Sequence, residues 1–187
     1  MRAVFFFLTL SVFFIALLTL VVHYYRRQVR TDEHPYGNWK KLLGRLSTVN
    51  RENVASIALS LVDELGQRRG DENDADLDEA EIWPMIGGIK GLETLERNCA
   101  VLVDLVFYVQ QWYPEALAIA EQLRLNVREI EWHIGRLKSA AESGRAEKVF
   151  PEHAEEVVAI YYVMTRRVLA LYEELNLPGV VELQRAL

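Results

Sequence analysis

Glu129 and His133 form the pair of side chains whose types and spacing best suit chemistry in this sequence. They lie four residues apart, so on a helix they would share one side, where a carboxylate and an imidazole can bind a metal together. A complete site would need ligands from a second helix, and a di-iron bundle needs paired Glu-x-x-His motifs, which the sequence lacks. We therefore expect no metal site, and we interpret His133 as a hydrogen-bonded histidine at the edge of the core.

A second pattern with metal-binding character lies in an acidic stretch of the chain. Three aspartates alternate there: Asp74, Asp76 and Asp78. Alternating acidic ligands begin a calcium loop, but that loop needs glycine at its sixth position and a bidentate glutamate at its twelfth. Glu79 and Met85 occupy these positions instead. The stretch is therefore predicted to be an exposed acidic linker over residues 70–82.

The glycine-rich segment 87–91 and Asp104 each imitate part of an active site. Glycines before a helix can offer backbone N–H groups to an anion, but this segment matches no nucleotide-binding motif and follows no strand. Asp104 interrupts an apolar run, yet on a helical wheel it belongs to a narrow polar stripe typical of a solvent-facing edge. The other members of that stripe are Lys90, Glu93, Arg97 and Gln111. We predict no catalytic residue, no cofactor and no enzyme activity.

The most distinctive line of residues lies on a predicted helix at 114–143, on the side away from its core. Ala118, Leu125 and Trp132 recur there every seven residues, flanked by Arg128 and Arg136. A tryptophan edged by arginines is typical of the anchor of a protein interface. Alternatively, another helix of the same domain covers this line. The sequence is compatible with both interpretations.

An uncharged apolar run over residues 3–22 precedes all these features. As a helix it is long enough to cross a bilayer, and it exceeds the apolar core of a cleaved signal peptide. Tyr24 and Tyr25 follow it, where aromatic rings favour the headgroup layer, and the basic residues after it outnumber those before it. Those basic residues are Arg26, Arg27 and Arg30. We therefore predict a single-pass membrane protein with its C-terminal domain in the cytoplasm.

A short amphipathic helix is predicted at 39–46, with a basic face opposite its apolar one. It either packs on the domain as its first helix or lies on the membrane surface, where basic side chains are attracted to anionic lipid. In the second case, the residues that contact the membrane surface are Tyr24, Tyr25, Arg26, Arg27, Arg30, Trp39, Lys40, Lys41 and Arg45.

The remaining apolar periodicity predicts only helices. Their expected ranges are 51–68 with Asn50 as N-cap, 77–83, 88–113, 114–143 and 151–176. The fold class is accordingly all-α, an N-terminal transmembrane helix followed by an antiparallel four- to five-helix bundle. Residues 1–30 form the anchor and its basic juxtamembrane segment, and residues 31–187 form the bundle domain. Cys99 is interpreted as a small buried hydrophobe within it.

Charge and composition narrow the function further. Arg2 is the only charged residue in 1–22, so the rest of the chain carries 20 basic against 27 acidic residues and is a poor candidate for binding nucleic acid. We expect a protein-interaction or scaffold module at the membrane, with a protein partner or a second copy as its ligand. The alternative is a bundle that holds a small ligand or metal between its helices. The only groups available for that role are Glu129, His133, Tyr108, Tyr161 and Tyr162.

Overall fold

The computed structural model describes residues 13–21, 38–63, 67 and 79–187. These residues form helices and connecting turns without a strand, which confirms the all-α class. The chain divides into two units, residues 1–38 and residues 39–187. The second unit is a helical bundle.

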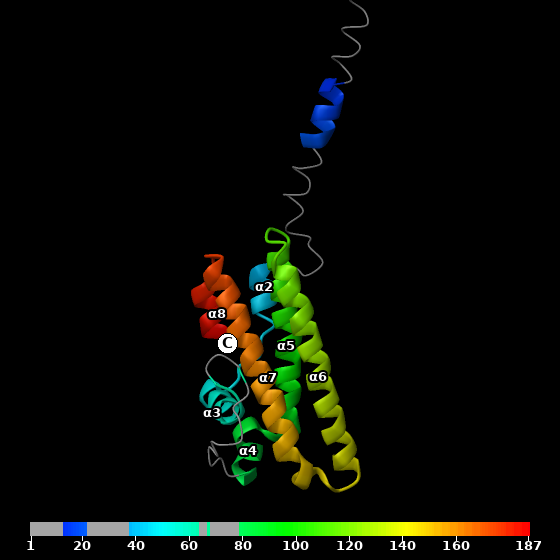
Figure 1. Ribbon diagram of the computed structural model, residues 1–187, viewed down its shortest axis with the longest axis vertical. Coiled ribbons are helices and arrows are strands. Elements are labelled where there is room, and N and C mark those ends of the chain that lie inside the picture. The colour runs from blue at the N-terminus through cyan, green and yellow to red at the C-terminus, as the bar shows by residue number, and fades with distance from the viewer. Residues whose placement is uncertain (1–12, 22–37, 64–66, 68–78) are drawn as a thin grey trace, which may run out of the picture. The chain divides into compact units, whose positions relative to one another are not determined.

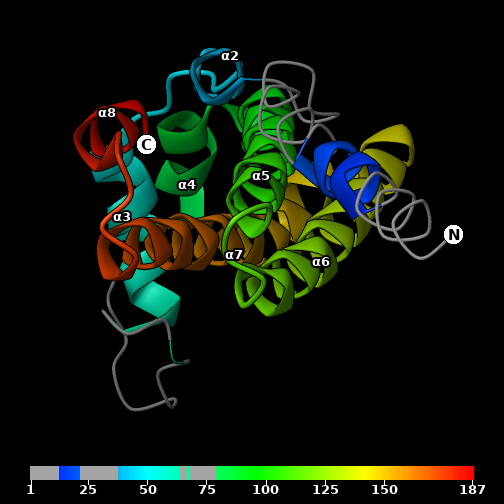
Figure 2. The same ribbon diagram turned by 90° about the horizontal axis from the view of Figure 1, so that it is seen from above.

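The bundle contains three long helices and four short ones within the described residues. They are α2 (Trp39–Leu43), α3 (Arg51–Leu61), α4 (Glu79–Ile86), α5 (Gly88–Gln110), α6 (Ala116–Glu142), α7 (Ala146–Glu174) and α8 (Val180–Ala186). The long helices α5, α6 and α7 run in alternating directions and pack against one another (Figure 1). In Figures 1 and 2, α6 lies on one side of the bundle, and α3 and α8 lie on the opposite side.

Helix α5, with its broad apolar surface, is one of two central elements, and α7, which packs against α3, α4, α5, α6 and α8, is the other. Helix α5 itself packs against α2, α4, α6 and α7. Its buried apolar side chains are Leu92, Leu95, Cys99, Val101, Leu102, Val103, Leu105, Val106 and Val109. Burial also raises the pKa of the Cys99 thiol far above its usual range, so this cysteine is protonated and inert.

The glycine-rich segment before α5 has a packing role. Gly87 and Gly88 adopt left-handed backbone conformations, with φ of 78° and 64°. A Cβ on Gly91 would overlap the carbonyl group of Ile86. Glycine is required at all three positions because a side chain is either strained or excluded there. Backbone geometry and packing therefore explain these glycines, and an anion site is not needed to explain them.

Several helix ends differ from the sequence-based prediction. The Asn50 cap is confirmed, since its Oδ1 accepts a hydrogen bond from the Asn53 N–H at 3.1 Å. Helix α3 nevertheless ends at Leu61, short of residue 68. Pro84 and Pro151 were expected to end and to begin helices, but both lie inside them. Pro84 is the sixth residue of α4 and Pro151 the sixth residue of α7, and each removes one intrahelical hydrogen bond because proline has no backbone N–H.

Residues 13–21 are helical, and their large apolar side chains are exposed. No helix within the described ranges combines the length and the apolar character needed to cross a membrane. The rest of the predicted span lies outside those ranges, as do Tyr24, Tyr25, Arg26, Arg27 and Arg30. Residues 70–78 of the predicted acidic linker, with Asp74, Asp76 and Asp78, also lie outside them, while residues 79–82 begin α4.

Helix α2 packs on the bundle through its apolar side. Leu42 is fully buried, and the indole N–H of Trp39 donates a hydrogen bond to the Tyr172 hydroxyl at 3.0 Å. Arg45 forms an ion pair with Asp104 of α5 at 2.7 Å. Lys40 and Lys41 are exposed. Of the residues considered for the membrane surface, Trp39 and Arg45 therefore contact the domain itself.

Asn98 fixes the segment between α2 and α3. Its side chain is buried, and its Oδ1 accepts from the backbone N–H of Ser47 while its Nδ2 donates to the Ser47 carbonyl, both at 2.9 Å. Nδ2 also lies 3.4 Å from the Tyr161 hydroxyl. Burial raises the pKa of Tyr161 to about 12, so this hydroxyl stays protonated at neutral pH. One amide thus joins three parts of the bundle.

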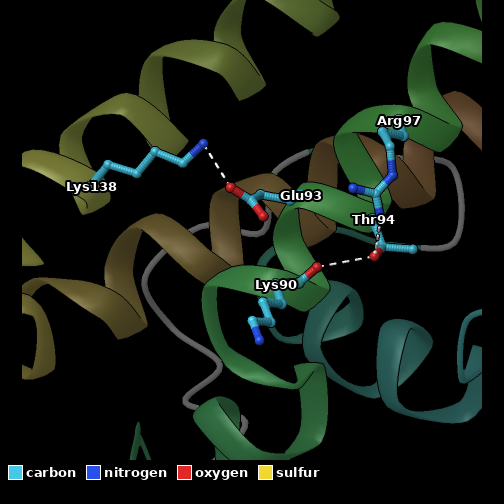
Figure 3. Close-up of polar contacts among 5 residues, drawn as sticks. All are labelled: Lys90, Glu93, Thr94, Arg97 and Lys138. Atoms are coloured by element: carbon cyan, nitrogen blue, oxygen red, sulfur yellow. Dashed lines mark hydrogen bonds and ion pairs between the residues drawn. The ribbon is translucent and has the colours of Figure 1, made fainter.

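An ion pair joins the polar edges of α5 and α6. Lys138 of α6 reaches Glu93 of α5 at 2.7 Å, and this cation lowers the pKa of the Glu93 carboxyl (Figure 3). Along α5, the Thr94 hydroxyl donates to the Lys90 carbonyl and accepts from Arg97. Within the polar stripe expected around Asp104, Glu93 and Asp104 therefore contact neighbouring elements, whereas Lys90 and Arg97 contact Thr94 of α5 itself.

Candidate interaction surface

The heptad line of α6 lies on the outer side of the bundle. Leu125 is 61% exposed and Trp132 is 58% exposed, and Ala118 is also exposed. Helix α6 packs on α5 and α7 through its other side. None of the helices described within residues 39–187 covers the line, so the alternative of a covering helix does not apply to the described part of the bundle.

Charged and apolar residues border this line. Arg128 and Arg136 are both exposed, on either side of Trp132 along the helix. The apolar spacing of the helix predicted at 114–143 places Leu117 in the core, but Leu117 is 43% exposed and its neighbour Ala116 is buried instead. We call the exposed set Ala118, Leu125, Arg128, Trp132 and Arg136 the α6 surface.

The Trp132 ring is held in place despite its exposure. The guanidinium carbon of Arg136 lies 5.9 Å from the ring centroid, within reach of a cation–π interaction. The ring meets His133 edge-on at a centroid distance of 4.8 Å and His153 at 5.7 Å. A tryptophan that is exposed but oriented by its neighbours loses little side-chain entropy when a partner covers it.

Beneath Trp132, two buried histidines form a pair between α6 and α7. The Nδ1 atoms of His133 and His153 lie 3.0 Å apart. Burial, followed by the neighbouring His153, lowers the pKa of His133, while Glu156, Glu129 and Glu152 oppose this shift. The neutral form of His133 is therefore favoured in the folded protein. The expectation of a hydrogen-bonded histidine is confirmed, although the side chain is buried rather than at the edge.

The groups considered for a ligand or metal site do not converge. Glu129 is exposed, whereas the His133 Nδ1 faces another histidine. Tyr108 packs edge-on against Trp112 at the far end of α5. Among the described residues, no three potential metal ligands of the histidine, cysteine, aspartate and glutamate types come together. These positions do not form one polar pocket.

Tyr161 and Tyr162 do line a shallow hollow of about 190 Å³ that residues from α3, α7 and α8 also border. Arg51, Thr165 and Arg166 are its other polar neighbours near the tyrosines. The hollow is small for a ligand site, since such sites usually measure about 300–1,000 Å³. It lies on elements other than α6, so it is separate from the α6 surface.

His153 of α7, which is buried beneath Trp132 of this surface, was not identified from the sequence. His133 and His153 stand at similar distances in sequence from Gly144, where the chain turns between α6 and α7. Residues placed in this way on an antiparallel helix pair lie at similar heights. Their similar spacing from the turn is the feature of the sequence from which the contact between His133 and His153 could have been predicted.

Comparison of this chain with protein families, with curated proteins and with solved structures finds no match.

Proposed function

We propose that this protein is an interaction module whose α6 surface binds a protein partner. The observation that carries this proposal is the exposure of Trp132 at 58% on a fixed, arginine-edged site. Tryptophan and arginine are the residue types that most often dominate binding energy at protein interfaces. Leu125 extends the apolar contact by two helical turns.

We further propose that residues 3–22 anchor this module in a membrane, with the bundle on the cytoplasmic side. The uncharged apolar run, the tyrosines after it and the arginine excess at 26–30 support this placement. The exposed apolar side chains of residues 13–21 are suited to contact lipid. Anchoring confines the module to two dimensions, which raises the effective concentration of any partner in the same membrane.

Photo-crosslinking of the full chain in intact cells tests the proposal. A photoreactive amino acid at Trp132 is expected to give one discrete adduct, because the side chain becomes buried against its partner. The matched control carries the same amino acid at Val181 of α8, which is 54% exposed and lies on a different helix. An adduct at both positions, or at neither, would contradict an interaction centred on α6.

A further inference from the structure

Acidic side chains lie toward the N-terminal end of the exposed side of α6 and arginines toward its C-terminal end, with exposed Glu129 as the exception. Glu115 and Glu121 stand toward its N-terminal end, Arg128 and Arg136 stand toward its C-terminal end, and Leu125 lies between the two groups. All five side chains are exposed, and Glu121 reaches Arg124 of its own helix at 3.2 Å. Glu115 precedes the helix but has helical backbone angles, so it continues the same surface. A second α6 running in the opposite direction would present opposite charges at each end.

We propose that the partner of the α6 surface is a second copy of this chain, paired antiparallel about a two-fold axis at Leu125. This inference rests on the proposed function and specifies its partner. A two-fold axis makes an interface self-complementary, so each contact occurs twice. Leu125 meets the partner's Leu125, and Trp132 meets the partner's Ala118. This pairing follows because Trp132 lies seven residues after Leu125 and Ala118 lies seven residues before it.

The arginines find acidic partners at the same register. Arg128 lies three residues after Leu125 and Glu121 lies four before it, so each Arg128 stands at the height of the partner's Glu121. Arg136 lies eleven residues after Leu125 and Glu115 lies ten residues before it, so each Arg136 stands near the height of the partner's Glu115. With 100° between successive residues, Arg128 and Glu121 project from one flank and Arg136 and Glu115 from the other. An antiparallel two-fold axis brings like flanks together, which makes both pairs direct.

The opposite orientation is electrostatically worse. In a parallel pair each residue stands at the height of its own copy, so the Arg136 side chains meet near the centre of the contact and the acidic ends meet as well. Like charges in facing positions are unfavourable, and such repulsion selects one orientation over another. The charge pattern therefore favours the antiparallel pair.

The contact is small. One helix face per subunit buries less than the roughly 1,200–2,000 Å² of a standard stable interface, so the pair is weak in solution. Confinement to one membrane would raise its occupancy without any new contact. Tests should therefore use the full chain in lipid bilayers.

Cysteine crosslinking in vesicles tests the register, since the natural Cys99 is buried and leaves the wild-type chain as a background control. Leu125→Cys places two thiols near the axis and is expected to give a covalent dimer with a short bismaleimide. Ala118→Cys is the matched control, because its two copies would lie about 21 Å apart along the helix. A dimer from both variants would mean parallel pairing, and a dimer from neither would mean no self-association through α6. Either result overturns the proposal.

Charge reversal provides a second test. In a pair of Arg128→Glu chains, and likewise in a pair of Glu121→Arg chains, residues 128 and 121 carry the same charge at both symmetry-related contacts. Self-association of either variant should weaken on the order of tenfold. Mixing the two variants should restore it, because every facing pair is again opposite in sign. Failure of the mixture to associate would overturn the register. A Trp132 photo-adduct with a different protein, without Leu125→Cys dimers, would leave the proposed function standing and reject only self-association.

Discussion

The Nδ1 atoms of His133 and His153 lie 3.0 Å apart in the buried contact between α6 and α7, with the Trp132 ring edge-on to both imidazoles. At this distance one Nδ1 donates a proton and the other accepts it. A positive charge on His133 would be buried and would face the His153 ring, and both effects lower the pKa of His133. The pair therefore couples the packing beneath Trp132 to pH.

Stability should fall on mild acidification. The pKa of His133 is lowered from its usual 6.5, so as the pH drops the unfolded chain takes up this proton before the folded one does. Neutral His133 therefore contributes to the free energy of unfolding above about pH 6.5. This contribution is lost as the pH falls from there through the lower pKa of the folded state. Thermal unfolding of the full chain between about pH 8 and pH 5 measures this loss. His133→Gln should flatten the profile, and an unchanged slope would contradict the assignment.

Removing the Asn98 side chain should be strongly destabilising. Asn98→Ala leaves the N–H and carbonyl of Ser47 without their partner and opens a cavity beside Tyr161. We expect a loss of about 2–3 kcal/mol in the free energy of unfolding, measured by urea titration. Ser47→Ala is the control, because both bonds use the Ser47 backbone, and it should change stability by less than about 0.5 kcal/mol. Equal effects would contradict this account.

Gly179→Ala tests whether α2 stays on the bundle. Gly179 has a φ of 93°, and an added Cβ would overlap the Trp39 ring. We expect a loss of about 1–3 kcal/mol from backbone strain and displacement of the ring. Trp39→Ala made in addition should relieve the steric part, so the combined loss should be smaller than the sum of the two single losses. Additive losses would indicate that α2 lies away from Gly179, as on a membrane surface.

The proposed anchor predicts where the C-terminus lies. Reporters active only in the cytoplasm should be active when fused to Leu187 in intact cells, and reporters active only outside should be silent. Replacing Arg26, Arg27 and Arg30 with glutamine should weaken this preference. Replacing Lys40 and Lys41 with glutamine is the matched control, since these residues lie farther from the apolar run. A signal only from the external reporter would reject the proposed orientation.

Much of the fold could be predicted because long helices carry strong periodic signals. Apolar spacing predicts the buried surface of α5, and local backbone chemistry predicts the Asn50 cap and the break near Pro114. The position of Trp132 on the side of α6 away from the core also followed from the helical wheel. What the wheel could not supply was the presence or absence of a covering helix, which depends on the packing of the whole bundle.

The errors have equally specific causes. Pro84 and Pro151 were treated as helix boundaries, although a proline inside a helix removes only one backbone hydrogen-bond donor. Leu117 was placed in the core by its apolar spacing, but Ala116 has the inward position. His153 was missed because its importance comes from a residue on another helix. Asn98 was missed because a polar residue within an apolar run gives no indication of which distant backbone it will bind.

The contact between Asn98 and Ser47 also provides a probe of dynamics. The Ser47 N–H bonds to a side chain 51 residues away, so its hydrogen can exchange with deuterium only when this segment separates from α5 or when the whole domain opens. Amides inside α2 or α3 can exchange by local fraying. The exchange rate of this single backbone hydrogen would therefore report how often the segment joining α2 and α3 leaves the bundle.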